Sequence, residues 1–190
     1  MQNHKKTNFE SLALYEDVKM RERQLPIRNS YETSPEKALI TDHARSTASR
    51  IAATQPLYGS IAFGEHNPKM QNIALHEGVG GYSDLPVPGD IFCGAIAGCL
   101  DSAIRVIANH LNIRLADLEV KVEADADLRG ALRMESSVQI GFKAIRVHTR
   151  IVPESDVPAA TLKAILTAAE GSCVILQTLR NPPKVEITTS

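Results

Sequence analysis

The sequence lacks an excess of charge of either sign. It has 21 lysines and arginines against 22 aspartates and glutamates, which gives a net charge of -1 over 190 residues. A large excess of one sign is the usual mark of a protein that binds nucleic acid or a membrane surface, so the charge indicates neither partner. A hydrophobic content of 43% and a charged content of 23% are typical of a globular protein with one domain, with or without an extension.

A long hydrophobic run is also lacking. The longest apolar-rich run without a charge, Ile91 to Leu100, is about half of the roughly 20 residues that a membrane-spanning helix needs. Near the N-terminus, where a signal peptide needs an apolar stretch, the sequence has Glu10, Glu16 and Asp17. We therefore expect a cytoplasmic protein without a membrane segment.

The sequence has only three cysteines, Cys93, Cys99 and Cys173, which are too few for a structural disulfide framework. They form no Cys-x-x-Cys pair and the histidines are scattered, so we predict no metal site. If Cys93 and Cys99 share a helix, six residues separate them by roughly 9 Å, beyond the roughly 7 Å that a disulfide allows between Cα atoms. An internal disulfide must then involve Cys173. The plain alternative is that each cysteine is a small buried packing residue.

The residue pattern of the N-terminal half predicts a helix followed by a small sheet. Apolar residues recur at helical spacing among charges over residues 8 to 24, and Pro26 is expected to end this helix. Two or three strands, separated by glycine and proline, are predicted between Ala38 and Glu77. We interpret this region as a β-meander.

A long helix is predicted next. A loop rich in glycine and proline, residues 78 to 90, ends at Asp90, which is a plausible helix N-terminal residue. From about Ile91 to His110, apolar residues recur at steps of three and four, so one stripe of the helix should face a core. Cys99 lies in this predicted stripe.

Strands and helices alternate in the C-terminal half. Apolar and charged residues alternate strictly around Leu118–Ala124, which predicts a strand with one solvent face, and a second strand should pair with it. The apolar phase of that second strand slips between Phe142 and Ile145, which indicates a bulge. The remaining predicted ranges are a strand at Val138–Val152, a helix at Val157–Glu170 capped by Gly171, a helix at Cys173–Leu179 and a last strand at Lys184–Thr188.

Three segments together resemble a known family. The sequence reads PGDIFCGAIAGCLDSAIR at residues 88–105, GFKAIRV at 141–147 and AEGSCVILQTL at 169–179. In order and spacing they resemble the OsmC/Ohr family, the osmotically inducible protein C and organic hydroperoxide resistance proteins. The resemblance covers roughly residues 38 to 188. It divides the chain into an N-terminal helical extension, residues 1–35, and an OsmC-like domain, residues 36–190.

The resemblance implies an α+β fold in which antiparallel sheets pack on a long central helix, and an intertwined homodimer. It also implies a peroxidase without a cofactor. Cys99 would attack an organic hydroperoxide to give a sulfenic acid, and Cys173 would resolve the sulfenate to a disulfide. An external dithiol or lipoyl-type reductant would then restore both thiols.

Peroxidase members of the family also use an arginine that stabilises the thiolate and a carboxylate that orients the arginine. Where the hydroperoxide resistance proteins place glutamate after the proline, this chain has Gly89, and the acid follows at Asp90. Asp90 is therefore either the orienting acid or only a helix cap. For the arginine we choose Arg50 over Arg45, and a solvated surface charge is the alternative for both.

Other interpretations stay open at this point. The same fold could be a non-enzymatic dimer that binds a small apolar ligand between subunits, or a thiol redox sensor in the stress response. Cys93 is interpreted as a packing residue on another side of the helix. His76 and Glu77 are further polar residues that could approach the site.

Overall fold

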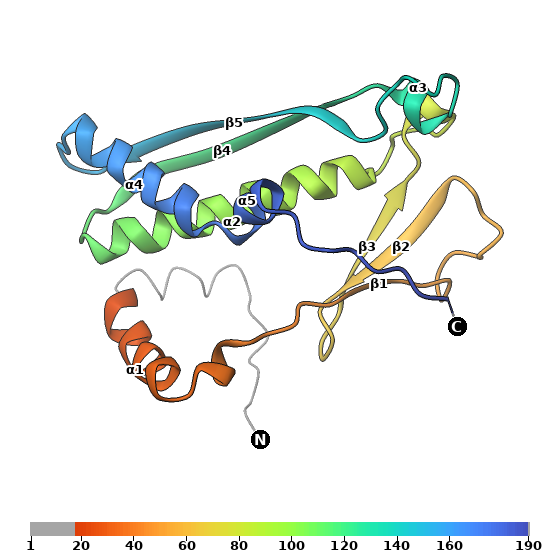
Figure 1. Cartoon of the computed structure of the whole chain (residues 1–190). Coiled ribbons are helices and arrows are strands. Elements are labelled where there is room, and N and C mark those ends of the chain that lie inside the picture. Colours follow the sequence, from red (N-terminus) through yellow and green to blue (C-terminus); the bar gives the residue numbers. More distant parts are fainter. Residues whose placement is uncertain (1–17, 190) are drawn as a thin grey trace.

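The computed structural model describes residues 18–189, so the predicted helix at residues 8–24 lies largely outside the described part. Helices and two strand systems alternate along the chain (Figure 1). The helices are α1 (Met20–Thr33), α2 (Pro88–His110), α3 (Leu128–Ala131), α4 (Ala159–Ser172) and α5 (Val174–Arg180), with the short 3-10 helices η2 (Pro35–Ala38) and η3 (Glu77–Val79). The strands are β1 (Ala44–Ser46), β2 (Tyr58–Phe63), β3 (Lys69–Ala74), β4 (Leu115–Ala126) and β5 (Phe142–Pro153).

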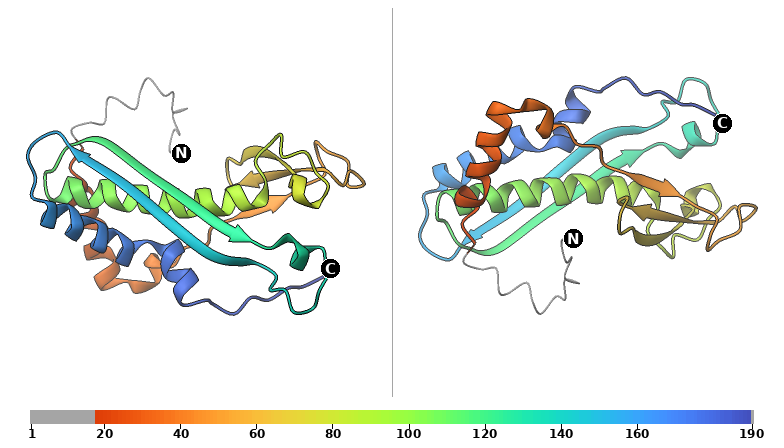
Figure 2. Two further views of the ribbon diagram at one scale, coloured as in Figure 1. Left: turned by 90° about the horizontal axis from the view of Figure 1, so that it is seen from above. Right: turned by 90° about the horizontal axis from the view of Figure 1, so that it is seen from below.

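Both strand systems are antiparallel, and the predicted α+β class is confirmed. β1, β2 and β3 form a three-stranded sheet in sequence order, which is the predicted meander. β4 and β5 form a two-stranded ribbon that runs along α2. Figure 2 shows that the three-stranded sheet projects from the N-terminal end of α2, while the ribbon and α4 lie along the rest of the helix.

The ribbon follows the predicted alternation of apolar and charged residues. β4 and β5 pair over nearly their whole length, with Val120 opposite Thr149 and Val122 opposite Val147. The register shifts near the start of β5, where Asp125 pairs with Ala144 and the next residue pairs with Phe142. The predicted bulge is thus confirmed, although β5 begins at Phe142 and the four residues before it are not part of the strand.

The core lies where α2 meets α4, α5 and the apolar face of the ribbon. The buried side chains of α2 recur at every fourth residue: Ile96, Leu100, Ile104 and Ala108. Residues at this spacing form one ridge along a helix, and each buried isoleucine or leucine contributes about 1.5–3 kcal/mol. The most buried ridge runs beside Cys99 and not through it, because Cys99 is only half-buried.

The length and apolar composition of α2 also raise the question of whether it could span a membrane. By length and composition alone, α2 is long and apolar enough to cross a membrane, and the bent pair of α4 and α5 passes the same test as one unit. Core helices of soluble proteins pass this test as well. In this chain α2 packs against α4 and β4, and four of its side chains are buried.

The prediction that Pro26 ends the first helix is wrong, because α1 runs through it to Thr33. Proline removes one helical hydrogen bond, at a cost of about 3 kcal/mol in a helix interior. Contacts outside the helix offset part of this cost. The side-chain amide of Asn109 on α2 donates to the carbonyl oxygen of Val18 and accepts from the N–H of Met20, both at 2.8 Å.

Two predictions near the C-terminus are also wrong. Gly171 does not cap α4, because the helix continues to Ser172 and ends at Cys173, whose backbone is extended. Residues 184–188 form no strand. Val185 and Ile187 are 78% and 91% exposed, so the apolar face of this segment has no sheet edge to pair with in a single chain.

Candidate redox site

The structure brings Cys99 and Cys173 together. Cys99 lies in the middle of α2, and Cys173 is the single residue between α4 and α5. The Cys99 side chain packs against the buried cluster that contains Cys173, and both cysteines are free thiols. Two thiols in contact can share a proton, and their oxidation by two electrons gives a disulfide. This contact joins residues that are far apart in the sequence.

Cys173 is held by a sharp turn in the chain. The axes of α4 and α5 differ in direction by 66°, and the Cys173 side chain is fully buried at the corner. Burial raises the pKa of the Cys173 thiol, the backbone N–H groups of Leu176 and Ile175 oppose the rise, and the neighbouring Cys99 adds to it. The Cys173 thiol is therefore harder to deprotonate than an ordinary cysteine.

Asp90 caps the start of α2. Its carboxylate accepts a hydrogen bond of 2.9 Å from the backbone N–H of Val87, which satisfies a group that a helix start leaves unpaired. Asp90 also affects another cysteine, since burial and then the Asp90 charge raise the pKa of Cys93. The structure thus pairs Asp90 with Val87 and Cys93, one turn away on the helix.

The arginine candidates lie on the three-stranded sheet and its loops. Arg45 is exposed on β1, and Arg50 is exposed in the loop that leads from β1 to β2. The described part of the chain gives neither guanidinium an ion pair, and this sheet makes only slight contact with α2. His76 is exposed too, and its Nδ1 accepts from the N–H of Gly78 at 2.9 Å. A single chain therefore brings none of these three residues to Cys99.

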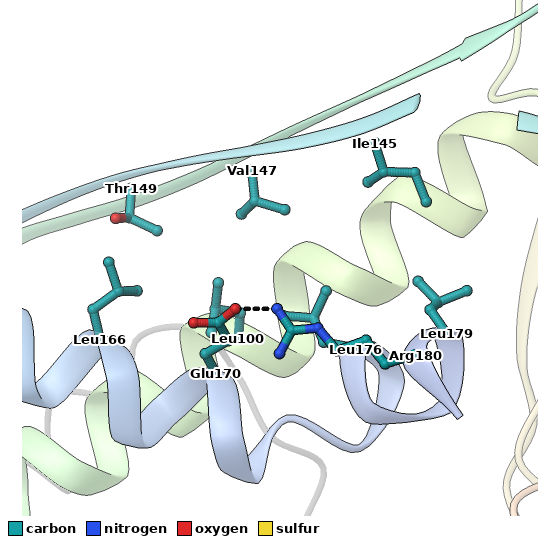
Figure 3. A pocket seen from close by; sticks show the side chains of 9 residues that line it. All are labelled: Leu100, Ile145, Val147, Thr149, Leu166, Glu170, Leu176, Leu179 and Arg180. Carbon is teal, nitrogen blue, oxygen red and sulfur yellow. Dashed lines mark hydrogen bonds and ion pairs between the residues drawn. The ribbon is translucent and has the colours of Figure 1, made fainter. Parts of the chain in front are cut away.

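A cavity of about 360 Å³ lies under β5 and between α4 and α5, and it is lined by Leu100, the residue after Cys99. It is mostly aliphatic, and Figure 3 shows an ion pair between Glu170 and Arg180 at its wall. The lining residues are Leu100, Ile145, Val147, Thr149, Leu166, Glu170, Leu176, Leu179 and Arg180. Sequence reasoning missed this cavity, because only the bend at Cys173 turns α5 back and brings Arg180 to Glu170.

Within residues 18–189, no group of three or more histidine, cysteine, aspartate or glutamate side chains could hold a metal ion. The site can carry out the chemistry of two neighbouring thiols. The fold and this pair define an α+β protein with a candidate dithiol centre.

The chain belongs to the OsmC-like protein family, whose match covers residues 81–188, more than half of the chain. The matched range includes α2, both strands of the ribbon, α4 and α5, and thus both cysteines of the pair. No curated protein matches the chain.

Solved structures of the family share the fold. An OsmC-like protein of unknown function from Vibrio cholerae superposes with a TM-score of 0.61 at 12% identity, over 74% of this chain and 94% of that one. An organic hydroperoxide resistance protein from Elizabethkingia anophelis gives 0.57 at 16% identity, over 76% and 91%. An organic hydroperoxide resistance protein OsmC from Legionella pneumophila gives 0.53 at 22% identity, over 75% and 90%.

Proposed function

We propose that this protein is a thiol-dependent peroxidase that reduces organic hydroperoxides. The observation that carries the proposal is the contact between half-buried Cys99 and buried Cys173 in a chain of the OsmC-like family. The names of two structural relatives, both organic hydroperoxide resistance proteins, point to the same substrate class. The mostly aliphatic cavity, which includes Leu100 and Leu176 of the cluster around Cys173, is also suited to an organic substituent.

The proposed reaction uses only the two thiols and an external reductant. The Cys99 thiolate attacks one oxygen of the hydroperoxide, the O–O bond breaks, and the leaving alkoxide takes a proton to become an alcohol. The Cys173 thiol then attacks the Cys99 sulfenic acid, which forms a disulfide and releases water. A dithiol of the lipoyl type reduces the disulfide and is itself oxidised, so both cysteines return to thiols.

The assignment of roles to the two thiols rests on burial and charge. Cys99 is half-buried, so a substrate can approach its sulfur, whereas Cys173 is fully buried. Burial, and to a lesser extent the neighbouring Cys99, raise the pKa of the Cys173 thiol, so Cys173 fits the resolving role better than that of the attacking thiolate. A thiol next to the sulfenate can capture it before it is oxidised further.

The proposal keeps Arg50 as the cation that stabilises the Cys99 thiolate, and Asp90 as the acid that assists it. In one chain Arg50 is exposed and Asp90 caps α2. Arg50 would therefore have to reach Cys99 from a second copy of the chain, or through a shift of its loop.

We also propose that the chain works as a cytoplasmic homodimer. Only four residues of the apolar helix α2 are buried in one chain, which leaves apolar surface for a partner to cover. The three-stranded sheet packs lightly on α2, and the apolar side chains of residues 184–188 lie exposed. A second copy would supply a surface on which the three-stranded sheet could pack. It would also supply a sheet edge with which residues 184–188 could pair.

The test is consumption of cumene hydroperoxide under anaerobic conditions with dihydrolipoamide as reductant. We expect Cys99→Ser to abolish turnover, because the nucleophile is lost. Cys173→Ser should allow reaction of Cys99 but stop rapid recycling, and mass spectrometry should find sulfenic or sulfinic acid at Cys99. Wild type treated with peroxide alone should carry a disulfide between Cys99 and Cys173.

Cys93→Ser is the matched control, since Cys93 lies on the same helix and is partly buried like Cys99. It should keep turnover near that of wild type. Consumption that is the same in wild type and Cys99→Ser would rule out the peroxidase. The cavity of about 360 Å³ would then favour the second candidate, a non-enzymatic dimer that binds a small apolar ligand.

A further inference from the structure

A second hollow lies between α1 and the C-terminal end of α2. Figure 1 shows α1 beside that end of α2. The volume of the hollow is about 240 Å³. We call it the arm cleft, and the residues that line it are Arg21, Gln24, Leu25, Arg28 and His110. A neighbouring hollow shares Arg21 and His110, so the arm cleft is open to solvent on that side.

Helix geometry places the polar residues of α1 in the arm cleft. Arg21, Gln24 and Arg28 are three and four residues apart, so they lie on one face of α1 over two turns. The two hydrogen bonds of Asn109 to Val18 and Met20 fix the start of α1 against α2. His110 follows Asn109 on α2. The contact of Asn109 with the start of α1 therefore sets how far His110 lies from the two arginines.

These polar groups lack partners within residues 18–189. Neither Arg21 nor Arg28 forms an ion pair or hydrogen bond there, and the Nε2 atom of His110 is covered without a hydrogen-bond partner. Glu22, the acid nearest in sequence to Arg21, pairs with Lys19 at 3.7 Å. Arg21 and Arg28 are exposed at the same hollow, so both guanidinium groups can bind a ligand of opposite charge.

We propose that the arm cleft binds the phosphate group of a small molecule. One arginine fork satisfies a carboxylate, whereas a phosphate dianion offers three oxygens and two charges and can accept from two guanidinium groups at once. The Gln24 amide supplies a further donor within the same hollow. The four lining residues on α1 lie outside the matched family range, and the proposed site does not depend on the peroxidase activity.

The test uses the full chain, with inorganic phosphate and glycerol phosphate as separate probes. Binding is measured by titration calorimetry and by the linewidth of the ³¹P resonance, at constant ionic strength maintained with chloride. We expect saturable binding of at least one probe, and a loss of affinity of at least about tenfold in Arg21→Gln and in Arg28→Gln. Binding of inorganic phosphate would show that the phosphate group suffices, and binding of the ester alone that the organic part contributes.

Arg23→Gln is the matched control, because Arg23 has the same charge on the same helix but does not line the arm cleft. It should leave the affinity within about twofold of wild type. The proposal is overturned if both probes bind more weakly than about 10 mM, or if Arg23→Gln weakens binding as much as the other two variants. Circular dichroism of each variant shows that a loss of affinity is not a loss of folding.

Discussion

At the scale of single residues, the three cysteines lie in different environments. Cys173 is fully buried, while Cys93 and Cys99 are partly buried on α2. Cys99 and Cys173 neighbour each other, whereas Cys93 has a pKa that is raised by burial and then by the charge of Asp90. Thiolate formation and access decide the reactivity of a cysteine, so these neighbours matter more than the number of cysteines.

The structure predicts two effects of Asp90→Asn. Loss of the charge should lower the pKa of Cys93, because the Asp90 carboxylate is one of the two causes that raise it. The variant should also lose about 1 kcal/mol of unfolding free energy, since the bond to the N–H of Val87 becomes weaker. The pH dependence of Cys93 alkylation by iodoacetamide and urea unfolding measure the two effects.

Asp101→Asn is the control for Asp90→Asn. Asp101 also lies on α2, but it forms an exposed pair with Arg105 at 2.8 Å. We expect no change in Cys93 alkylation and a stability change of only a few tenths of a kcal/mol. If Asp90→Asn reduces peroxide turnover while the alkylation profile of Cys93 stays fixed, Asp90 acts as the proposed acid and not through Cys93.

At the scale of elements, the solvent face of the ribbon carries a row of opposite charges. Arg146 on β5 pairs with Asp125 on β4 at 2.5 Å, and Arg150 pairs with Asp117. At the end of the ribbon, Asp127 accepts hydrogen bonds from Arg129 and Lys143. Opposite charges across neighbouring strands favour one register, so the row supports the pairing that the apolar face also requires.

These pairs predict that the protein loses stability in acid. Hydrogen bonds from Arg129 and Lys143 hold the pKa of Asp127 well below its ordinary 3.8, and Arg146 lowers that of Asp125. A carboxyl group with a lowered folded pKa stabilises the fold above its unfolded pKa, and this stabilisation is lost as the pH falls through the folded value. The urea midpoint should therefore fall as the pH drops below about 4.

Asp127→Asn should make the urea midpoint fall less steeply in acid, because the carboxyl group that takes up a proton is gone. Asp156→Asn is the control, since Asp156 is exposed between β5 and α4 and forms no ion pair with any described residue. It should leave the slope of the urea midpoint against pH unchanged. Equal slopes for wild type and Asp127→Asn would show that the ribbon charges do not contribute to acid stability.

At the scale of the whole molecule, much of α2 has no cover in one chain. A Cβ atom added at Gly94 or Gly98 would meet nothing within 4 Å, so this side of α2 is open. Open glycines one turn apart allow close approach of another helix. The proposed homodimer places a second copy against this side of α2.

Two glycine-to-alanine variants test the homodimer. Alanine in a solvent-exposed helix position is more stable than glycine by about 0.5–1 kcal/mol. Gly171→Ala on α4 should show this gain, since the added Cβ meets nothing within 4 Å. Gly98→Ala should instead weaken dimerisation, because a partner helix occupies the space. Sedimentation equilibrium and thermal unfolding of both variants measure the effects, and a gain in both would contradict a dimer contact at Gly98.

The sequence by itself determined the features that depend on local pattern. Strict alternation around Leu118 predicted β4, and the phase slip after Phe142 predicted the bulge of β5, because side chains of a strand alternate between a wet and a dry face. Apolar spacing predicted α2, and the three motif segments identified the family that the comparisons confirm. In each case residues close in the sequence carry the information.

Only the tertiary structure decided the features that depend on distant neighbours. Periodicity could not show that Cys99 contacts Cys173, because the contact requires the turn between α4 and α5. The anchoring of α1 by Asn109, and the lack of a sheet edge for residues 184–188, were likewise beyond local reasoning. Propensity describes what a segment can form by itself, whereas hydrogen-bond partners and burial come from whichever segments the fold places beside it.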